Sequence, residues 1–484
     1  MSNDLLDLPE GWELVKLGDI CNVQGGYAFK SSDYQENGIP LLRISNIINK
    51  CVSFNSDTVY LNPTYEKTYQ DFLVEKGDIV IALSGATTGK YGIYTENDKA
   101  LLNQRVGRLK FFNCSLIIPY YIFYYTEIIK EIILIKAYGA AQPNISTNNL
   151  AQFKIPLPPL NEQKRIVAKI EELNDRSQTA QKALETIPQL CDRFRQSVLA
   201  AAFRGDLTAD WREKNPDVEP ASVLLERIHN TKFQPSIIEY KRELPGNWIW
   251  SKFADIAAIK SNLVSPSDYL EFPHIAPNHI VSNTGELLEF TTIQEDKVTS
   301  PKHLFEPGQI LYSKIRPYLA KAVLVNFSGL CSADMYPISS FINSSFLHHW
   351  IICPEFTEMA SNQQGRTVLP KINQVALNQL LVPVPPSEEQ KQIVSLIEKY
   401  FKIIETIEKQ HQQTTEKLEK LNQSILSKAF RGELVPQDPD DEPASVLLER
   451  IRAEREKLNN NKPKSTSKRK GKTPKEQGTI PGLE

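Results

Sequence analysis

Two short stretches resemble sites of nucleotide or methyl-transfer chemistry, and both depart from the required pattern. The run Gly85–Tyr91 looks like a phosphate-binding loop, but it is one residue short and ends in Tyr where Ser or Thr must reach Mg²⁺. The run Asn62–Tyr65 resembles the Asn-Pro-Pro-Tyr box of amino-methyltransferases, but it lacks the second Pro and an upstream glycine-rich loop. The first run is better interpreted as a turn after a strand, which presents Ser84, Thr87 and Lys90.

Further polar side chains, of the kinds that contact base edges, lie near expected turns. Arg and Lys can bind guanine in the major groove of DNA, and Asn and Gln can bind adenine. Any one of them is more often an ordinary surface residue, so the hypothesis of DNA contact rests on the whole group. Besides the three residues of the first turn, the candidates are Gln104, Arg105, Gln142, Asn144, Asn278, His279, Lys314, Arg316, Arg366 and Lys371.

The overall charge does not indicate a nucleic-acid partner. The 484 residues include 56 Lys and Arg against 58 Asp and Glu, which leaves a formal charge of −2. A nucleic acid would therefore have to be bound by local patches rather than by the global charge. With 41% hydrophobic residues the chain is not wholly disordered, and its length favours two to four domains.

Cysteine spacing and hydropathy argue against a metal site and a membrane span. The six cysteines form no Cys-x-x-Cys pair and have no His at zinc spacing, so we expect reduced thiols. The most apolar window, Tyr120–Tyr138, is interrupted by Glu127, Lys130, Glu131 and Lys136, which predicts an amphipathic helix. The N-terminus lacks the regions of a signal peptide, and we expect a cytoplasmic protein.

The chain repeats itself. Residues 156–167 recur at 383–394 and residues 197–207 recur at 424–434, both shifted by 227 positions. The ten residues 219–228 recur unchanged at 442–451. A weaker match, Leu-Pro-x-x-Trp, opens each half at Leu8–Trp12 and Leu244–Trp248, whereas residues 20–155 and 256–382 share little. The order is therefore variable, constant, variable, constant.

The constant blocks predict two long coiled-coil helices. Apolar residues follow a 4-3-4-3 spacing over five heptads, and every position in one block lies 227 residues from its counterpart in the other. We expect each helix to end near Gly205 or Gly432 and to span about 42 residues, or roughly 60 Å. An antiparallel pairing of the two would give the chain an approximate internal two-fold axis. The predicted seam positions are Ile166, Ile170, Leu173, Ser177, Ala180, Leu184, Ile187, Cys191, Phe194 and Val198 in the first block and Ile393, Ile397, Tyr400, Ile404, Ile407, His411, Thr414, Leu418, Leu421 and Ile425 in the second.

Departures from ideal helices are also predicted. Pro188 should bend or break the first helix, because proline removes a backbone hydrogen bond, whereas its counterpart is Thr415. Polar Ser177, His411 and Thr414 at seam positions are candidates for setting the register. Residues 222–228 and their copy predict a short second helix, and residues 459–484 predict a disordered basic tail.

Residues 20–155 and 256–382 predict two mixed α/β domains, each large enough for its own core. Short β-rich runs alternate with Gly, Asn and Asp turns, for example at 79–83, 92–94 and 105–109 in the first and 309–312 and 321–325 in the second. Helices are expected at 119–137 and around 346–359. The predicted fold class is α+β, with two mixed α/β domains separated by two long antiparallel coiled-coil helices in a pseudo-two-fold repeat.

This arrangement resembles the DNA-specificity subunit of type I restriction–modification enzymes over about residues 8–455. Pro-Leu-Pro-Pro-x-x-Glu-Gln-Lys-x-Ile-Val and Ala-Phe-Arg-Gly-x-Leu follow the variable parts, and Leu-Pro-x-x-Trp opens each half. The resemblance implies target-recognition domains at 1–155 and 244–382, helical spacer regions at 156–243 and 383–458, and the tail at 459–484.

The resemblance also implies function and partners. Each recognition domain would read one half of a bipartite, asymmetric site on double-stranded DNA, and the helices would fix the spacing between the halves. The chain would be noncatalytic and would dock two methyltransferase subunits and, through them, restriction and translocase subunits. S-adenosylmethionine, ATP and Mg²⁺ would belong to those partners. The alternatives are a coiled-coil scaffold whose variable domains bind proteins, and a self-contained nuclease or methylase.

Overall fold

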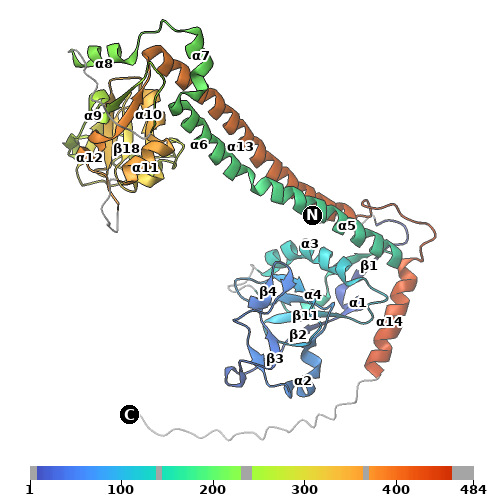
Figure 1. The fold of residues 1–484 in the computed structure, drawn as a ribbon. Coiled ribbons are helices and arrows are strands. Elements are labelled where there is room, and N and C mark those ends of the chain that lie inside the picture. The colour runs from blue at the N-terminus through green and yellow to red at the C-terminus, as the bar shows by residue number, and fades with distance from the viewer. Residues whose placement is uncertain (1–7, 138–143, 231–241, 363–369, 461–484) are drawn as a thin grey trace, which may run out of the picture. The chain divides into compact units, whose positions relative to one another are not determined.

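The computed structural model describes residues 8–137, 144–230, 242–362 and 370–460 (Figure 1). The chain divides into unit 1, with residues 1–181 and 416–484, and unit 2, with residues 182–415. Each unit therefore contains one variable domain and a share of both long helices. In the described part of the chain, no helix is long and apolar enough to cross a membrane.

The variable domain of unit 1 is built on three β-sheets in its described residues. A two-stranded sheet joins β1 and β12, and two larger sheets have the orders β2-β11-β8-β9-β5-β4 and β6-β3-β10-β7. All four residues of β8 are buried, as expected for the central strand that its continuous apolar run predicts. The strands are β1 (Glu13–Lys16), β2 (Cys21–Gly25), β3 (Ile39–Leu42), β4 (Ile47–Ile48), β5 (Cys51–Val52), β6 (Tyr60–Leu61), β7 (Leu73–Val74), β8 (Ile79–Ala82), β9 (Tyr91–Ile93), β10 (Ala100–Leu102), β11 (Val106–Phe111) and β12 (Lys154–Leu157).

The variable domain of unit 2 repeats this plan with fewer strands. A two-stranded sheet joins β13 and β22, and two four-stranded sheets have the orders β14-β21-β18-β19 and β15-β17-β20-β16. The predicted β-rich runs of both domains are therefore strands, and the predicted fold class is confirmed. The strands are β13 (Ile249–Lys252), β14 (Ala257–Ile259), β15 (Leu263–Val264), β16 (His274–Ile275), β17 (Lys302–Phe305), β18 (Ile310–Ser313), β19 (Ala322–Leu324), β20 (Gly329–Cys331), β21 (Met335–Ser340) and β22 (Leu381–Val384).

Helices pack on these sheets. In unit 1, α3 (Pro119–Ala137) forms as predicted and contributes Tyr121 and Ile122 to a core shared with Ile79 of β8. In unit 2 the single helix expected around 346–359 is wrong, because the chain forms α10 (Ser344–Ile351) and α11 (Pro354–Asn362) instead. Proline disfavours a helical conformation at the preceding residue and lacks an N–H, so Pro354 begins a new helix rather than continuing the old one.

The first long helix is broken near Pro188, as predicted. One residue, Thr186, separates α5 (Leu160–Glu185) from α6 (Ile187–Arg204). Pro188 lies in the first turn of α6, where a missing N–H costs little. The second long helix, α13 (Ser387–Phe430), is continuous over 44 residues. The first helix ends at Gly205 with a φ of 83°, and Gly432, with a φ of 75°, follows the second.

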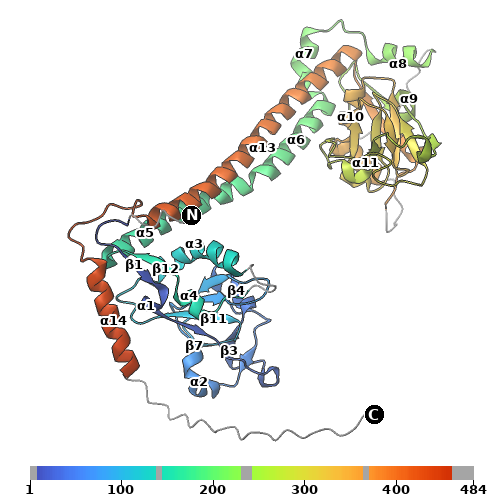
Figure 2. The same cartoon turned by 180° about the vertical axis from the view of Figure 1, so that it is seen from behind.

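The long helices pair antiparallel, as predicted. In unit 1, Ile166 and Ile170 at the beginning of α5 share a core with Ile425 and Phe430 at the end of α13. In unit 2, four residues at the end of α6 share a core with Ile393 and Ile397 at the beginning of α13: Val198, Leu199, Ala202 and Phe203. Both views show α6 beside α13 (Figures 1 and 2).

The predicted seam is wrong in the C-terminal part of α13. Ile407, Thr414 and Leu421 are exposed, whereas the residues one position further along, Glu408, Thr415 and Asn422, are partly buried. His411, Leu418 and Ile425 keep their predicted places. In a straight α-helix, positions of a strict seven-residue repeat rotate around the helix axis by about 20° per heptad. Over several heptads, this rotation turns one of the two seam positions in each heptad away from the partner helix and brings the next residue into the seam.

Other predicted seam positions, three polar ones and two in the first helix, also differ in part from the observed burial. Ser177 is buried and His411 partly buried, but Thr414 bonds the Gln410 carbonyl of its own helix at 2.7 Å. Thr414 is therefore not a register-setting seam residue. In the first helix Ala180 and Phe194 are exposed, contrary to prediction, and Arg195 is buried, whereas Cys191 and Val198 keep their predicted buried places.

The short helices complete each unit with a segment from a constant block. In unit 2, α8 (Ala221–His229) follows α7 (Ala209–Lys214) and bonds Asn247. In unit 1, α14 (Ala444–Asn460) lies beside α1 (Leu17–Ile20), and Leu447, Leu448 and Ile451 enter the core of the first variable domain (Figure 1). Both short helices were predicted, and α14 is longer than expected. The tail was predicted to begin at residue 459, but residues 459 and 460 still belong to α14, and the rest of the predicted tail, 461–484, lies outside the described residues.

Candidate nucleic-acid interface

Both variable domains contain the same hairpin turn. The turn of the first domain leads from β8 to β9, and Ala82 N donates to Lys90 O at 2.7 Å; the turn of the second leads from β18 to β19, and Ser313 N donates to Lys321 O at 2.9 Å. The run Gly85–Tyr91 therefore leads into a strand, whereas a nucleotide phosphate loop leads into a helix.

Both turns need left-handed backbone at the same two positions. The first uses Gly85 (φ 98°) and Gly89 (φ 84°), and the second uses Arg316 (φ 48°) and Ala320 (φ 44°). Residues other than glycine are disfavoured in this conformation and often mark functional turns. The turn of the second domain is therefore held in a strained form that presents the exposed Tyr318 at its tip.

Four of the predicted DNA-contacting residues meet in the first domain. Ser84, Gln104, Arg105 and Asn144 line a hollow of about 450 Å³, which we call the first junction. Three backbone segments form it: Ser84 pairs with Asn144 as an isolated bridge, Leu83 N donates to Arg105 O at 2.9 Å, and Ile145 N donates to Leu83 O at 2.9 Å. Residues far apart in the sequence are thereby held on one surface.

The second domain contains the same backbone arrangement, which we call the second junction. Ile315 pairs with Lys371 as an isolated bridge, Lys314 N donates to Asp334 O at 3.0 Å, and Ile372 N donates to Lys314 O at 2.9 Å. The three predicted residues Lys314, Arg316 and Lys371 therefore lie together. In this correspondence Ile315 takes the place of Ser84, Asp334 that of Arg105, and Lys371 that of Asn144.

The two junctions differ in chemistry. In the first, Gln104, Arg105 and Asn144 are exposed, and Arg105 has no ion pair with any residue that the structure describes. In the second, Lys371 Nζ lies 3.1 Å from Asp334 Oδ1, and Lys314 Nζ donates to Ala333 O at 2.6 Å. Arg with Asn or Gln suits purine edges, whereas a carboxylate can accept from the cytosine amino group.

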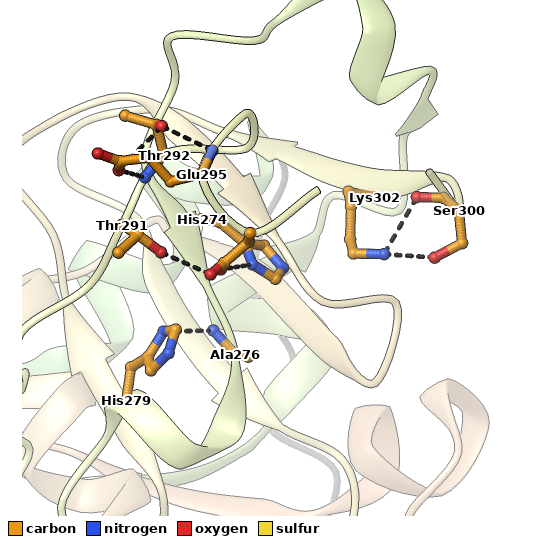
Figure 3. Close-up of polar contacts among 9 residues, drawn as sticks. His274, Ala276, His279, Thr291, Thr292, Glu295, Ser300 and Lys302 are labelled. Carbon is orange, nitrogen blue, oxygen red and sulfur yellow. Dashed lines mark hydrogen bonds and ion pairs between the residues drawn. The ribbon is translucent and has the colours of Figure 1, made fainter. Parts of the chain in front are cut away.

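Asn278 and His279 lie elsewhere in the second domain, on the 3₁₀ turn η6 (Pro277–His279). Ala276 N donates to His279 Nδ1 at 3.2 Å (Figure 3). In the first domain, Arg43 N donates to Asn46 Oδ1 at 2.9 Å in the corresponding turn η2 (Ile44–Asn46). His279 thus caps its own turn through Nδ1. Asn278 is exposed.

A hydrogen-bonded group, in which His274 is buried and Asp296 and Thr291 are exposed, lies next to this turn. His274 Nδ1 and Asp296 Oδ2 are 2.7 Å apart, and Thr291 Oγ1 donates to Asp296 Oδ1 at 2.7 Å (Figure 3). These contacts hold the pKa of Asp296 below its usual value, because Thr291 and then His274 stabilise the carboxylate. The group links the loop that follows η6 to β16. Neither this group nor any other part of the described chain contains three His, Cys, Asp or Glu side chains placed to hold a metal ion.

The predicted DNA-contacting residues not yet located are Thr87, Lys90, Gln142 and Arg366. Thr87 and Lys90 lie on the other side of the first turn and line a separate cavity of about 270 Å³. Gln142 and Arg366 lie outside the described residues. Tyr318 and Asp334 were missed. The match of Gly77–Ile79 with Gly308–Ile310, a shift of 231, would have found Tyr318 opposite Thr87, but it places Tyr336 opposite Arg105, so only the backbone hydrogen bonds of the structure identify Asp334.

Each domain is fixed to its long helix by the constant motifs. Trp12 Nε1 donates to Glu162 Oε2 at 2.9 Å in unit 1, and Trp248 Nε1 donates to Glu389 Oε2 at 2.9 Å in unit 2. The next residue, Gln163 or Gln390, donates to a proline carbonyl and accepts a backbone N–H in the same way in both units. The repeated Trp and Glu-Gln motifs thus form one duplicated attachment.

The two attachments differ in one respect. Glu389 Oε1 also accepts from Thr208 at 2.7 Å and from Arg212 at 2.5 Å, whereas Glu162 Oε1 is buried without a hydrogen-bond partner among the described residues. Burial raises the pKa of Glu162, and the hydrogen bond from Trp12 only partly opposes this. The second constant block lacks a helix corresponding to α7, which supplies Arg212 in the first.

Comparison with known proteins agrees with this architecture. Residues 9–189 and 245–417 match the family model described as type I restriction modification DNA specificity domain, and the chain belongs to this family. It is 37% identical to the type I restriction enzyme EcoDI specificity subunit of Escherichia coli, over 93% of this chain and 96% of that protein. It is 28% identical to the EcoBI specificity subunit of Escherichia coli, over 94% of each.

Solved structures share the fold. One, from a study of complex assembly and conformational transition of the type I R-M system, has a TM-score of 0.64 at 19% identity and covers 88% of this chain and all of its own. The HsdS subunit from Thermoanaerobacter tengcongensis has a TM-score of 0.55 at 17% identity and covers 90% of this chain and all of its own. At these identities the likeness shows the fold alone.

Proposed function

We propose that the chain is the noncatalytic subunit that gives a type I restriction–modification complex its DNA specificity. Each variable domain reads one half of a bipartite, asymmetric site through its junction. The observation that carries this proposal is that one backbone arrangement occurs in both domains with different side chains, Arg105 and Asn144 in one and Asp334 and Lys371 in the other. Base contacts specify sequence, whereas a fixed frame sets geometry.

The long helices and constant motifs set that frame and dock the partners. Two methyltransferase subunits bind the constant regions, and restriction and translocase subunits join through them. S-adenosylmethionine, ATP and Mg²⁺ bind to those partners. The hairpin geometry of Gly85–Tyr91 supports this division, because it does not fit the strand-to-helix loop that holds a nucleotide. The complex acts on double-stranded DNA in the cytoplasm.

The test uses the chain together with its methyltransferase partner. Mapping of methylated adenines should reveal one bipartite sequence, and the chain alone should not methylate DNA. Exchange of residues 256–382 for the corresponding domain of another family member should change one half-site only. A change in both half-sites would contradict modular reading, and the absence of any sequence-selective footprint would favour a protein-binding scaffold.

A further inference from the structure

A cavity lined by lysines lies beside the first junction. Its lining residues, which we call the lysine cleft, are Lys50, Thr87, Thr88, Lys90, Tyr91 and Lys130, and its volume is about 270 Å³. They come from three elements: the turn between β4 and β5, the hairpin turn after β8, and α3. The hairpin turn also carries Ser84, so the first junction and the lysine cleft share one backbone segment.

The cleft carries excess positive charge in a fixed arrangement. Glu127 Oε2 lies 2.6 Å from Lys50 Nζ, and Glu127 Oε1 lies 3.7 Å from Lys130 Nζ. Lys90 has no ion pair among the residues that the structure describes, so one carboxylate opposes three ammonium groups. Tyr91 donates its hydroxyl to Glu127, which anchors the carboxylate below the lysines.

The protonation states fit this arrangement. Burial alone would raise the pKa of Glu127, but the hydrogen bonds from Lys50 and Tyr91 outweigh it and the pKa falls below its usual value. Burial and the neighbouring carboxylate raise the pKa of Tyr91, which keeps its hydroxyl protonated as a donor. Glu127 is therefore the ionised partner and Tyr91 the protonated donor in this contact.

The backbone also holds one lysine in a disfavoured conformation. Lys50 has a φ of 64° in the left-handed region, and Asn283, at the corresponding place in the second domain, has a φ of 65°. Asn adopts this conformation more readily than Lys. The fold thus requires a left-handed residue at this point, and the first domain places a lysine there.

The second domain has the corresponding cavity without the lysines. It measures about 460 Å³, and Asn283, Tyr318, Thr357 and Glu358 are among its lining residues. Tyr318 occupies the place of Thr87. Lys321, the counterpart of Lys90, donates to Pro277 O at 2.7 Å and does not line this cavity, so the cluster of three lysines belongs to the first domain.

We propose that Lys50, Lys90 and Lys130 bind one phosphate group of the DNA backbone next to the half-site that the first junction reads. The inference rests on the proposed function and adds a contact that carries no sequence information. Three ammonium groups suit a phosphate, and Thr87 supplies a hydroxyl at the rim of the same cleft. Because the second cavity lacks lysines, this contact is made on one side of the bipartite site only.

The test measures the salt dependence of DNA binding by the complex with its methyltransferase partner. Neutralising one phosphate contributes about 0.9 to the slope of log affinity against log salt. The double variant Lys90→Gln/Lys130→Gln should lower that slope by about 0.9 and the affinity roughly tenfold at 0.1 M salt. The loss should be equal on cognate and noncognate duplexes, and Lys67→Gln, on α2 (Tyr65–Thr68) outside the cleft, should change neither quantity.

A second variant should change the salt-dependence slope and the affinity for DNA in the opposite direction. Glu127→Gln removes the opposing carboxylate and should raise the slope and the affinity for any duplex. An unchanged slope in both variants, or a change in the preferred half-site sequence, would overturn the phosphate contact while leaving DNA reading intact. If the wild-type complex itself does not discriminate between duplexes, the proposed function fails instead. Competition by inorganic phosphate, but no change in duplex binding, would mark a site for free anions and would also overturn the proposal.

Discussion

Trp12 donates its indole N–H to Glu162 Oε2 at 2.9 Å, across 150 residues of sequence. The bond joins the first strand region of unit 1 to the beginning of α5. The same pair occurs in unit 2 between Trp248 and Glu389. The attachment of a variable domain to its helix therefore depends on a buried carboxylate, and its stability depends on how fully that carboxylate is paired.

Trp12→Phe should destabilise unit 1 more than Trp248→Phe destabilises unit 2. The first change leaves both oxygens of buried Glu162 without a partner, which costs about 1–3 kcal/mol or more. After the second change, Glu389 keeps Thr208 and Arg212. Hydrogen exchange of β1 and β12, compared with β13 and β22, measures each unit separately. Equal losses of protection in the two units would contradict the difference in pairing.

Arg212→Ala should destabilise unit 2 by about 3–5 kcal/mol, because it leaves the buried carboxylate of Glu389 without its cation. Denaturant unfolding with hydrogen exchange of β13 and β22 provides the measurement. The double variant Arg212→Ala/Glu389→Gln should recover part of the loss. No recovery would mean that Arg212 acts through packing on Trp248 rather than through charge.

The stability of unit 1 should fall as pH rises from about 4 to 6. Burial raises the pKa of Asp78 to about 6 from an ordinary value of 3.8, and the hydrogen bond from Glu75 N and the nearby charge of Arg108 only partly oppose the shift. The folded state thus holds a proton that the unfolded state releases earlier, so the stabilisation present below pH 4 is lost through pH 6. The shift corresponds to roughly 3 kcal/mol.

Asp78→Asn should remove this pH dependence, which denaturant unfolding at pH 4.5 and 7.5 would measure. The exposed Asp57→Asn serves as the control and should leave the slope intact. In the second domain Gln309 already stands at this position and donates to Ser339 Oγ at 2.9 Å. An unaltered pH slope in Asp78→Asn would show that another group titrates.

Arg105→Ala and Asp334→Ala should each relax specificity in a different half-site. Loss of one good contact to a base edge reduces discrimination by about 1–3 kcal/mol at that base pair. Methylation mapping with the partner subunits reads both half-sites in one experiment. Relaxation of the same half-site by both variants would contradict the correspondence of the two junctions.

The duplicated pair of long helices could be predicted from the sequence, because repeated motifs indicate repeated structure. The sequence also predicted the break near Pro188 and the short strands, since proline chemistry and apolar runs act locally. The seam of α13 was predicted at Thr414 instead of Thr415, because a seven-residue pattern does not report how far a helix departs from supercoiling. Phe194 was expected in the seam, and its ring does pack on Tyr400 of α13, but it is partly exposed and the buried residue beside it is Arg195, which bonds Glu408 at 3.2 Å.

The interface was only partly predictable. The hairpin turn and the residue types were visible, but the meeting of Ser84 with Asn144 depends on a bridge between segments 60 residues apart. Nothing in local spacing reports such a pairing. The partner of Trp12 was hidden for the same reason, since conserved spacing within a motif does not name the residue that it contacts.

The position of α14 has a consequence for synthesis of the protein. Arg455 of this helix lies over Phe112 and 3.9 Å from Asp19, so the domain made first is finished by residues made near the end. During translation, all segments that form the core of the variable domain of unit 2 have been made once the beginning of α13 leaves the ribosome. The variable domain of unit 1 still lacks α14 at that point, so the apolar face that α14 covers remains exposed. A ribosome that stops before residue 444 would release a chain whose defect lies at its beginning.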